Sequence, residues 1–305
     1  MIGVYGAGGF IGKHLTERLA REGRNVRAVL RHTDNDLLDL GKGNVDIINA
    51  DLMDPLAMAS SLDGINTVVQ LISSSSPGLG NHYMIADVTS NIIPHIEFMN
   101  SCIAAGVKRY IFVSSGGTVY GPTRICPIPE DHPTNPISSH GLTKLTTEKY
   151  LQMQGYVSGL DYVILRVANA YGPGQTYRKG QGLIPSVLEH HGRDEAIQII
   201  GDGLARRDYV FVDDVVDACV AAIDVSGPQQ QVFNIGSGES RSVLEVLDSM
   251  ETVLGVGFRR EFVEKRRTDV DINQLDIAKA RRMLDWHPQT TFIEGLTQML
   301  SGIHF

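Results

Sequence analysis

The chain has little cysteine, no long apolar run and no basic block. Its three cysteines (Cys102, Cys126 and Cys219) are widely spaced and form no CxxC motif. This pattern argues against a disulfide framework and a zinc knuckle, and it is typical of a reducing compartment. No apolar run has the length of a membrane span, so a transmembrane protein is not expected. No metal site is predicted either.

The charge balance is acidic. The 27 Lys and Arg residues face 35 Asp and Glu residues, which gives a net charge of −8 and argues against general nucleic-acid binding. An anionic ligand would need local positive charge from a few Arg or Lys and from helix N-termini. The first residues, MIGVYGAGGFIG, carry no basic stretch and no cleavage site of a signal peptide, so the expected location is cytoplasmic.

Short apolar runs alternate with amphipathic segments in the first half of the chain. This alternation predicts βαβ units and a parallel sheet with helices on both faces, an α/β fold. Strands are expected at 2–5, 26–30, 45–50, 67–71, 110–113, 163–167, 209–212 and 232–235. Helices are expected from residue 12 to about 23, at 91–105, from 213, at 243–254 and from about 277. We predict a first domain over 1–175 and a smaller lobe over 176–305, with segments near 209–235 returning to the first domain.

A glycine loop joins the first predicted strand to the first predicted helix. In GVYGAGGFIGKHL, Gly6 permits a tight turn, Gly9 lets the backbone approach a pyrophosphate, and Gly12 lets the helix pack closely on the strand. A diphosphate would sit on the free N–H groups of the helix N-terminus. The loop therefore predicts a bound dinucleotide, with a purely structural turn as the alternative.

The end of the second predicted strand bears on the choice between NAD and NADP. Leu30 stands where an acid would bind the ribose 2′-hydroxyl of NAD, and Arg31 follows it. This charge favours NADP, unless Arg31 is a surface residue and the ribose is bound by other groups. Asp51, after the third strand, either accepts a hydrogen bond from the adenine amino group or caps the next helix.

Seven motifs along nearly the whole chain carry a resemblance. They are GAGGFIG (6–12), VSSGGTVYG (113–121), TNPISSHGLTK (134–144), LRVANAYGPGQ (165–175), ARRDYVFVDDVVDA (205–218), FNIGSG (233–238) and DIAKARRMLDWHP (276–288). Together and in this order they resemble the extended short-chain dehydrogenase/reductase family, and within it the nucleotide-sugar epimerases of the UDP-glucose 4-epimerase type. The resemblance implies a Rossmann-type doubly wound sheet, with a nicotinamide cofactor on the first domain and a nucleotide diphosphate-sugar, UDP-linked, on the C-terminal α/β lobe.

The resemblance also assigns binding residues. Those matched to the cofactor are Gly6, Gly9, Phe10, Ile11, Gly12, Arg31, Asp51, Leu52, Leu71, Ile72, Asn91, Ser114 and Lys144. Those matched to the sugar nucleotide are Asn169, Arg207, Arg266 and Asp269. The two arginines would supply the local positive charge that an acidic protein needs for a diphosphate. For each arginine alone, a surface ion pair is the competing interpretation.

The catalytic motif departs from the family. The family carries Tyr-x-x-x-Lys on one helix and a Ser or Thr nearby, but here His140 stands four residues before Lys144 and Gly116 stands at the Ser/Thr position. A histidine is a reasonable general base near neutral pH, although it is shorter than tyrosine. Ser115 or Thr118 could replace the missing hydroxyl. Strand alternation, if the strand continued that far, would place only one of them toward the substrate.

Three interpretations of this departure remain. In the first, the protein is an active enzyme whose base is His140, Tyr120 or a group of the substrate. In the second, it binds a nucleotide sugar or NADP without turnover. A laboratory substitution at His140, the third, would not explain Gly116.

The residues at positions 117 and 118 also limit which reaction of the family an active enzyme could catalyse. The Asp-Glu pair that the family's dehydratases need is missing, because Gly117 and Thr118 occupy its place. C4 epimerisation of a UDP-hexose through a transient 4-keto sugar ranks first. Reduction of a 4-keto nucleotide sugar with NADPH ranks second.

Other residues suggest structural roles. His190 and His191 are adjacent and point in different directions on a helix, so a metal site is not expected there. Asp213 and Asp214 are predicted to cap a helix, and Trp286 is predicted to be packed. By the resemblance, the helices beginning near Asn91 and Ser139 would form a homodimer contact.

Overall fold

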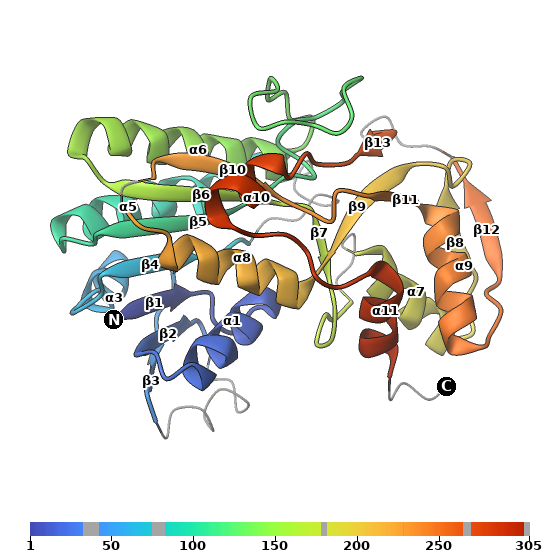
Figure 1. The fold of residues 1–305 in the computed structure, drawn as a ribbon, viewed down its shortest axis with the longest axis horizontal. Helices are drawn as coiled ribbons and strands as arrows, with labels where there is room; N and C mark the ends of the chain where they lie inside the picture. Colours follow the sequence, from blue (N-terminus) through green and yellow to red (C-terminus); the bar gives the residue numbers. More distant parts are fainter. Residues whose placement is uncertain (33–42, 75–82, 178–181, 228, 265–269, 302–305) are drawn as a thin grey trace.

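A computed structural model describes residues 1–32, 43–74, 83–177, 182–227, 229–264 and 270–301. Its centre is a seven-stranded parallel sheet (Figure 1). In spatial order the strands are β10 (Gln231–Ile235), β6 (Asp161–Val167), β5 (Arg109–Ser115), β4 (Thr67–Gln70), β1 (Ile2–Tyr5), β2 (Val26–Leu30) and β3 (Val45–Asn49). The order reverses between β1 and β4, which is the switch point at which doubly wound sheets bind ligands.

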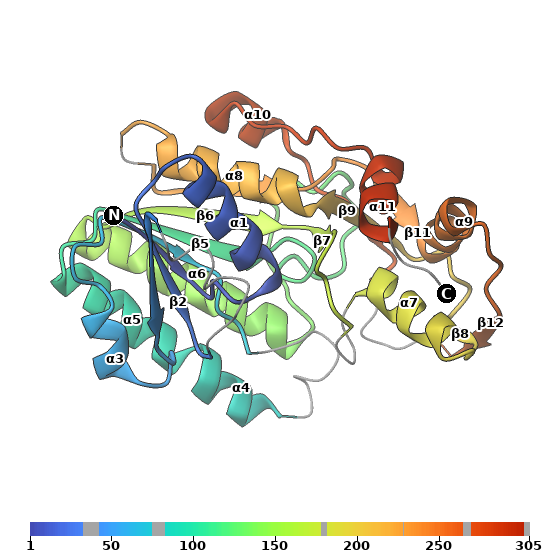
Figure 2. The same ribbon diagram turned by 90° about the horizontal axis from the view of Figure 1, so that it is seen from below.

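Helices cover both faces of this sheet (Figures 1 and 2). On one face lie α1 (Phe10–Arg21), α8 (Val212–Asp224) and α10 (Ala278–Leu284). On the other lie α3 (Pro55–Ser60), α5 (Ile93–Ala104) and α6 (Ser139–Ser158), with α4 (Met84–Asn91) beside them. Alternate residues of each central strand enter the two cores: Ile111 faces α1 and α8, and Tyr110 and Phe112 face α5. The strands are buried on both faces, so their sequences read as continuous apolar runs.

A smaller lobe lies at one end of the molecule and contains the last described helix (Figure 1). It contains a sheet of β7 (Asn169–Tyr171), β9 (Arg206–Phe211), β11 (Ser240–Ser242) and β13 (Ile272–Asn273). A second, two-stranded sheet pairs β8 (Ile197–Ile200) with β12 (Arg260–Val263). The helices of the lobe are α7 (Leu183–Gly192), α9 (Val243–Leu254) and α11 (Phe292–Leu300).

The helix predicted over 91–105 is confirmed as α5, which runs over Ile93–Ala104, whereas the preceding helix α4 was missed. Helix α4 ends at Asn91 and α5 begins at Ile93, with Ile92 between them. Pro94 lies in the first turn of α5, where its missing N–H costs no hydrogen bond, so the proline starts a new helix. Asn91 is therefore the last residue of one helix rather than the first of another.

The predicted capping role of Asp213 and Asp214 is also wrong. Helix α8 follows β9 directly, with Phe211 at the cap position and no side-chain cap. The carboxylate of Asp214 instead accepts hydrogen bonds from the backbone N–H groups of Gln289 (2.8 Å) and Thr290 (3.2 Å). Trp286 is packed as predicted, and its indole N–H donates to the Asp214 carbonyl at 2.9 Å. Helix α11, which the prediction missed, follows this anchored segment.

Strand β10 comes late in the chain but lies in the seven-stranded sheet beside β6. The chain thus passes from the main sheet to the smaller lobe and back. Among the described helices, none combines the length and the apolar character that crossing a membrane requires.

Candidate active site

The candidate site lies where the carboxyl ends of β1, β4 and β5 meet. The glycine loop follows β1, Leu71 and Ile72 follow β4, and Ser115 ends β5. The Leu71 N–H donates to the Tyr5 carbonyl at 2.9 Å, which extends the pairing of β4 with β1 up to the loop. Ligands of doubly wound folds bind at this edge.

At Gly6 and Gly12 the glycine loop leaves no room for a side chain. Gly6 has φ +91°, and a Cβ there would lie 3.1 Å from the Ile72 nitrogen. A Cβ on Gly12 would overlap the Gly6 carbonyl and lie 2.9 Å from the Ala7 Cα, so α1 packs directly on the loop. Gly9 caps α1 without a side chain, so the N–H groups of the first turn, at Phe10 and Ile11, have no side-chain cap. This geometry fits a bound diphosphate.

The nucleoside end of the predicted cofactor site lies beside the loop. A Cβ on Gly8 would be 3.6 Å from the Leu30 Cβ, so the end of β2 adjoins the glycine loop. Arg31 follows and is exposed. Asp51 accepts from the Met53 N–H at 3.0 Å, and Leu52 is buried.

Asp51 does not cap the following helix. The carboxylate of Asp54 caps α3 by accepting from the N–H groups of Leu56 and Ala57, both at 3.1 Å. The capping alternative for Asp51 is therefore wrong, while an adenine contact stays a prediction.

His140 and Lys144 lie one turn apart in the first half of α6, which places both side chains on one side of the helix. His140 is buried, and the Lys144 ammonium donates to the Val113 carbonyl at 2.8 Å and lies 4.9 Å from the centre of the Phe112 ring. Burial lowers the pKa of Lys144 to about 8, and the Glu148 carboxylate partly offsets this.

The loop after β5 packs against the start of α6. A Cβ on Gly141 would lie 2.6 Å from the Thr118 carbonyl oxygen, so glycine at 141 permits the close approach. The N–H groups of Thr118 and Val119 both donate to the Ser115 carbonyl, so the strand ends in a turn at Ser115. Strand alternation does not extend to Thr118, and the prediction that Ser115 and Thr118 face opposite sides does not apply.

Gly116 is not an open position where a hydroxyl is missing. A Cβ there would lie 2.5 Å from Leu275 Cδ1 and 2.9 Å from the Arg166 carbonyl oxygen. In this backbone a serine at 116 would therefore point into the core. Beside Gly117 there is space instead: a Cβ on Gly117 would be 3.9 Å from both Ser115 Oγ and Asn169 Oδ1.

Two further hydroxyl side chains near this loop, Thr118 and Ser114, differ in whether they form hydrogen bonds. Thr118 Oγ1 is buried and has no hydrogen-bond partner among the described residues. The Ser114 hydroxyl donates to the Glu148 carboxylate at 2.5 Å. The hydroxyl donor of Ser114 is therefore already used.

Tyr120 is unsuited to act as a base. Its side chain is fully buried, its hydroxyl donates to Asn234 Oδ1 at 2.6 Å, and it accepts from the Arg166 guanidinium at 3.0 Å. Burial raises the pKa of Tyr120 to about 12 despite the adjacent guanidinium. Arg166 also forms a buried ion pair with Glu148 at 2.7 Å. The alternative that Tyr120 removes the substrate proton is wrong.

A chain of polar contacts joins the loop after β4 to α6. Asn91 Oδ1 accepts from the Ser74 N–H at 2.9 Å, and its amide donates to Asp87 at 2.9 Å. The other Asp87 oxygen accepts from the Ser139 hydroxyl at 2.5 Å. Asn91 thus fixes the loop against the residue that precedes His140. Asp87 and Ser139 were missed, because their pairing depends on how α4 meets α6.

The residues predicted to hold the sugar nucleotide are spread along the smaller lobe. Asn169, at the start of β7, donates to the Asp208 carbonyl at 3.0 Å. Arg207 lies on β9, and its guanidinium donates to the Arg206 carbonyl at 2.8 Å. Arg266 and Asp269 lie outside the described residues.

Two basic side chains of this region were missed by sequence reasoning. Arg241 lies directly opposite Arg207 in the β11–β9 pair and stacks on Phe292 at 4.8 Å. His14 on α1 contacts the Pro173 carbonyl, just after β7, at 2.9 Å and Asp213 of α8 at 3.3 Å. No spacing in the sequence reveals either contact, because both join distant segments.

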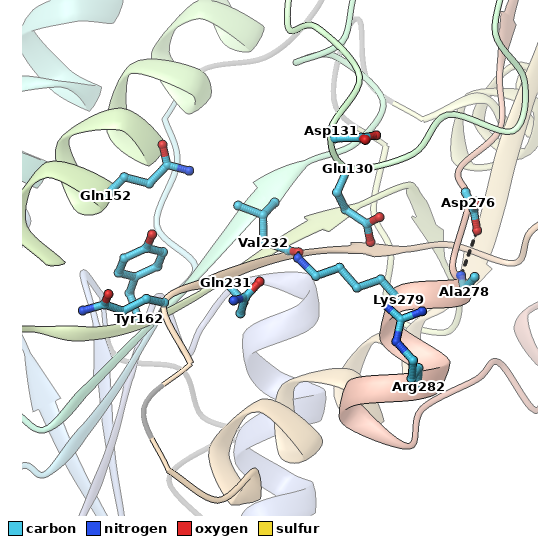
Figure 3. A pocket seen from close by; sticks show the side chains of 11 residues that line it. Glu130, Asp131, Gln152, Tyr162, Gln231, Val232, Asp276, Ala278, Lys279 and Arg282 are labelled. Atoms are coloured by element: carbon cyan, nitrogen blue, oxygen red, sulfur yellow. Dashed lines mark hydrogen bonds between the residues drawn. The ribbon is translucent and has the colours of Figure 1, made fainter. Parts of the chain in front are cut away.

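A wide groove of about 500 Å³ lies away from these residues, at the free edge of β10 (Figure 3). Two charged side chains protect this edge. Lys279 donates to the Val232 carbonyl at 2.8 Å, and Glu130 accepts from the Asn234 N–H at 2.9 Å. These groups cover the unpaired backbone of the edge strand, which explains the groove's polar lining without a ligand.

Within the described residues, no group of three or more His, Cys, Asp or Glu side chains is placed to hold a metal ion. His190 bonds the Ser186 carbonyl, and His191 packs on Phe258.

Comparisons with known proteins agree with this geometry. A family model described as "NAD dependent epimerase/dehydratase family" matches residues 2–236. The chain is 33% identical over 306 residues to a UDP-glucose 4-epimerase of Mycolicibacterium smegmatis, covering 97% of this chain and 96% of that one. It is 32% identical over 243 residues to a dTDP-4-dehydro-6-deoxyglucose reductase of Escherichia coli, covering 80% and 76%.

Solved structures of UDP-glucose 4-epimerases are also similar to this chain. The UDP-glucose 4-epimerase of Thermotoga maritima with UDP-glucose has a TM-score of 0.91 and 32% identity, over 98% of this chain and 97% of that one. The Thermus thermophilus UDP-glucose 4-epimerase in complex with NAD has a TM-score of 0.90 and 26% identity, with the same coverage. The predicted α/β fold is confirmed. The NADP preference inferred from Leu30 and Arg31 is not supported by such NAD complexes.

Proposed function

Because the chain belongs to the NAD-dependent epimerase/dehydratase family, we propose that it interconverts the C4 epimers of a UDP-hexose through a transient 4-keto sugar. The observation that carries this proposal is the placement of His140 and Lys144 one turn apart, beside the loop after β5. Two of the epimerases named above, one similar over nearly the whole chain and one solved with UDP-glucose, support the substrate class.

We propose NAD as the cofactor, held by the glycine loop, Leu71, Ile72 and the residues after β2 and β3. Gly6 and Gly12 let the loop pack closely on Ile72 and on α1, and the uncapped first turn of α1 fits the diphosphate. A bound nicotinamide would supply reversible hydride chemistry at C4 of the sugar. The exposed guanidinium of Arg31 would attract a 2′-phosphate, so the affinities for NAD and NADP should be compared directly.

The chain's own residues would handle the proton and orient the sugar. His140 removes the proton of the C4 hydroxyl as hydride leaves and returns it after the 4-keto sugar has rotated. The Lys144 ammonium would hold the nicotinamide ribose. Thr118 Oγ1, buried and unpartnered among the described residues, or Ser115 Oγ beside Gly117 would orient the hydroxyl.

The nucleotide would extend from this point into the smaller lobe. Asn169, close to Gly117, would contact the substrate near its diphosphate. Arg207, Arg266 and Asp269 would bind the diphosphate and the nucleoside ribose, and we add Arg241 because it lies opposite Arg207. This assignment corresponds to a cofactor domain over 1–175, joined by segments of 209–235, and a substrate lobe in the rest of 176–305.

A homodimer is also proposed. Helices α4, α5 and α6 leave large apolar side chains exposed on neighbouring elements: Met84, Ile85, Val88, Ile93, Leu142, Met153, Tyr156 and Val157. Exposed apolar clusters of this kind mark protein interfaces.

A second candidate function is reduction of a 4-keto nucleotide sugar. The similarity to the Escherichia coli reductase and the exposed Arg31 favour it. A reductase needs one hydride transfer and an exchangeable reduced cofactor, whereas an epimerase needs a retained cofactor and no net redox change. A third possibility, binding without turnover, would follow if His140 could not replace tyrosine.

A proton NMR time course tests the proposal. The protein is incubated with UDP-glucose and then with UDP-N-acetylglucosamine, each with NAD and with NADP. The proposal predicts that the anomeric signal of the C4 epimer appears without net reduction of cofactor. Consumption of NADPH with a 4-keto sugar and no epimerisation would favour the reductase, and line broadening without chemical change would indicate a binder.

A further inference from the structure

A buried imidazole lies behind Lys144. His95 on α5 is 3% exposed, and neither of its ring nitrogens has a hydrogen-bond partner among the described residues. The backbones of Asn91 and Ile72 approach the ring without reaching hydrogen-bonding geometry. Leaving a buried polar group unsatisfied is costly, so the ring should have a partner in the folded protein.

A small cavity of about 10 Å³ lies between this imidazole and the lysine. Its lining comes from β4, α4, α5, β5 and α6: Ile72, Ser73, Asn91, His95, Phe112, Thr143, Lys144 and Thr147. The volume suits one water molecule, and a water needs two or more polar partners to stay in such a site.

Both ring nitrogens of His95 and two donors of Lys144 are still available, whereas several other lining groups have committed their donors. The hydroxyls of Thr143 and Thr147 donate to backbone carbonyls, and the Asn91 amide bonds Asp87 and Ser74. Lys144 has three donors, of which one reaches the Val113 carbonyl. One donor can point to a ribose, which leaves one for the cavity.

The two side chains share the Phe112 ring as a wall. The Lys144 ammonium lies 4.9 Å from its centre, and the His95 ring packs edge-on at 6.0 Å. Burial, and then the Lys144 charge, lower the pKa of His95 to about 4, so the imidazole is neutral at physiological pH. A neutral imidazole has one nitrogen that accepts a hydrogen bond.

We propose that one water occupies this cavity, accepts a hydrogen bond from the Lys144 ammonium and donates one to His95. His95 is then a positioning residue: it acts through the water to hold the ammonium charged and aimed at the ribose. The charged groups that act on Lys144 are the Glu148 carboxylate on its own helix and whatever ligand lies in front of it. The role in turnover rests on the proposed function, whereas the water and its effect on Lys144 do not.

The first test needs no substrate. The side-chain amine of Lys144 is titrated by NMR in protein carrying isotope-labelled lysine, with Lys144→Met to assign the signal. We expect His95→Leu to lower the Lys144 pKa by about one pH unit, since the ammonium loses one acceptor of ordinary strength. His95→Gln, which keeps an acceptor oxygen, should recover most of this loss. Tyr110→Phe removes another buried, unpartnered polar atom that does not line the cavity, and it should leave the titration unchanged.

A crystal structure of the unmodified protein gives a second measurement that does not depend on any variant folding. It should show ordered water density within hydrogen-bond distance of both Lys144 Nζ and a His95 nitrogen. An unchanged titration in His95→Leu, or a cavity without water at high resolution, would overturn the proposal.

Turnover separates this proposal from the function. If epimerase activity is present, His95→Leu should lower kcat roughly tenfold with KM little changed, and should move the alkaline limb of the pH profile downward. If the protein binds NAD without turnover but the titration shifts, the proposed reaction fails and the role of His95 stands. If turnover is present and the Lys144 titration does not move, the proposed reaction stands and the role of His95 fails.

Discussion

At the scale of single residues, glycines 116 and 117 have opposite environments although they are neighbours. A side chain at 116 would meet Leu275 and the Arg166 carbonyl, whereas a side chain at 117 would meet ordinary contacts at 3.9 Å. The sequence suggested that Gly116 marks a lost catalytic hydroxyl. That inference depended on the direction of one Cα–Cβ bond, which spacing in a motif does not reveal.

This contrast gives a stability prediction. Gly116→Ala should lower the free energy of unfolding by about 1–3 kcal/mol, because the added methyl overpacks the core. Gly117→Ala is the matched control and should change it by less than about 0.5 kcal/mol. Urea denaturation of both variants measures the difference. Equal stabilities would show that the backbone at 116 moves to accept a side chain.

Lys144 leads to a prediction about pH. Burial lowers its pKa to about 8, so the ammonium is present below this pH and is lost above it. If the ammonium holds the cofactor ribose, kcat/KM should decline as the pH rises through about 8 in the absence of other titrations. A pH profile of kcat/KM measures this limb, and a flat profile up to about pH 10, the ordinary range of a lysine pKa, would contradict the role given to the charge.

At the scale of secondary structure, helix α6 is fixed to the sheet by a buried ion pair. Glu148, four residues after Lys144, pairs with Arg166 of β6 at 2.7 Å, and both side chains are almost fully buried. Glu148 also raises the Lys144 pKa against the effect of burial. One carboxylate therefore links the stability of the helix to the charge of the candidate catalytic lysine.

Glu148→Gln should accordingly destabilise the protein by about 3–5 kcal/mol, because it leaves the Arg166 guanidinium buried without its counter-charge. In the same variant the alkaline limb assigned to Lys144 should move to lower pH. The exposed pair Arg193–Glu189 offers the control, since Glu189→Gln should cost less than about 1 kcal/mol. Thermal unfolding and the pH profile are measured together, and a Glu148 variant as stable as the control would contradict the argument.

Most strands and several helices follow from local patterns in the sequence. The glycine at 12, the helix 243–254 with its cap at Ser242, and the apolar strands are local signals, and the structure has them. The predictions that failed concern features that tertiary contacts determine. Asn91 was expected to begin a helix but ends α4, which was missed, and Asp214 uses its carboxylate on a segment 75 residues away.

At the scale of the whole molecule, the exposed apolar side chains gather on α4, α5 and α6, on the face of the sheet opposite to α1 and α8 (Figure 2). On α6, Leu142, Met153 and Tyr156 recur at helical spacing and are 52%, 46% and 91% exposed. A second copy of the chain would bury them. The sequence showed that these helices are amphipathic, but their grouping into one surface required the fold.

The double substitution Met153→Glu with Tyr156→Glu should therefore convert a dimer into a monomer, since it places two charges in the proposed apolar contact. Phe262→Glu on β12, 58% exposed and in the smaller lobe, is the control and should leave the mass unchanged. Analytical ultracentrifugation gives the mass of each. A monomeric unmodified protein, or a dimer that survives both charges, would contradict the proposed interface.

The central claim is that His140 replaces the family's tyrosine as the general base. The most direct test compares turnover of UDP-glucose by the unmodified protein, His140→Ala and His140→Tyr, with the exposed His287→Ala as control. We predict that His140→Ala loses at least about 100-fold in kcat while NAD still binds, and that His140→Tyr retains turnover. His287→Ala should be unaffected. Turnover by His140→Ala equal to that of the unmodified protein would contradict the account and assign the base to another group.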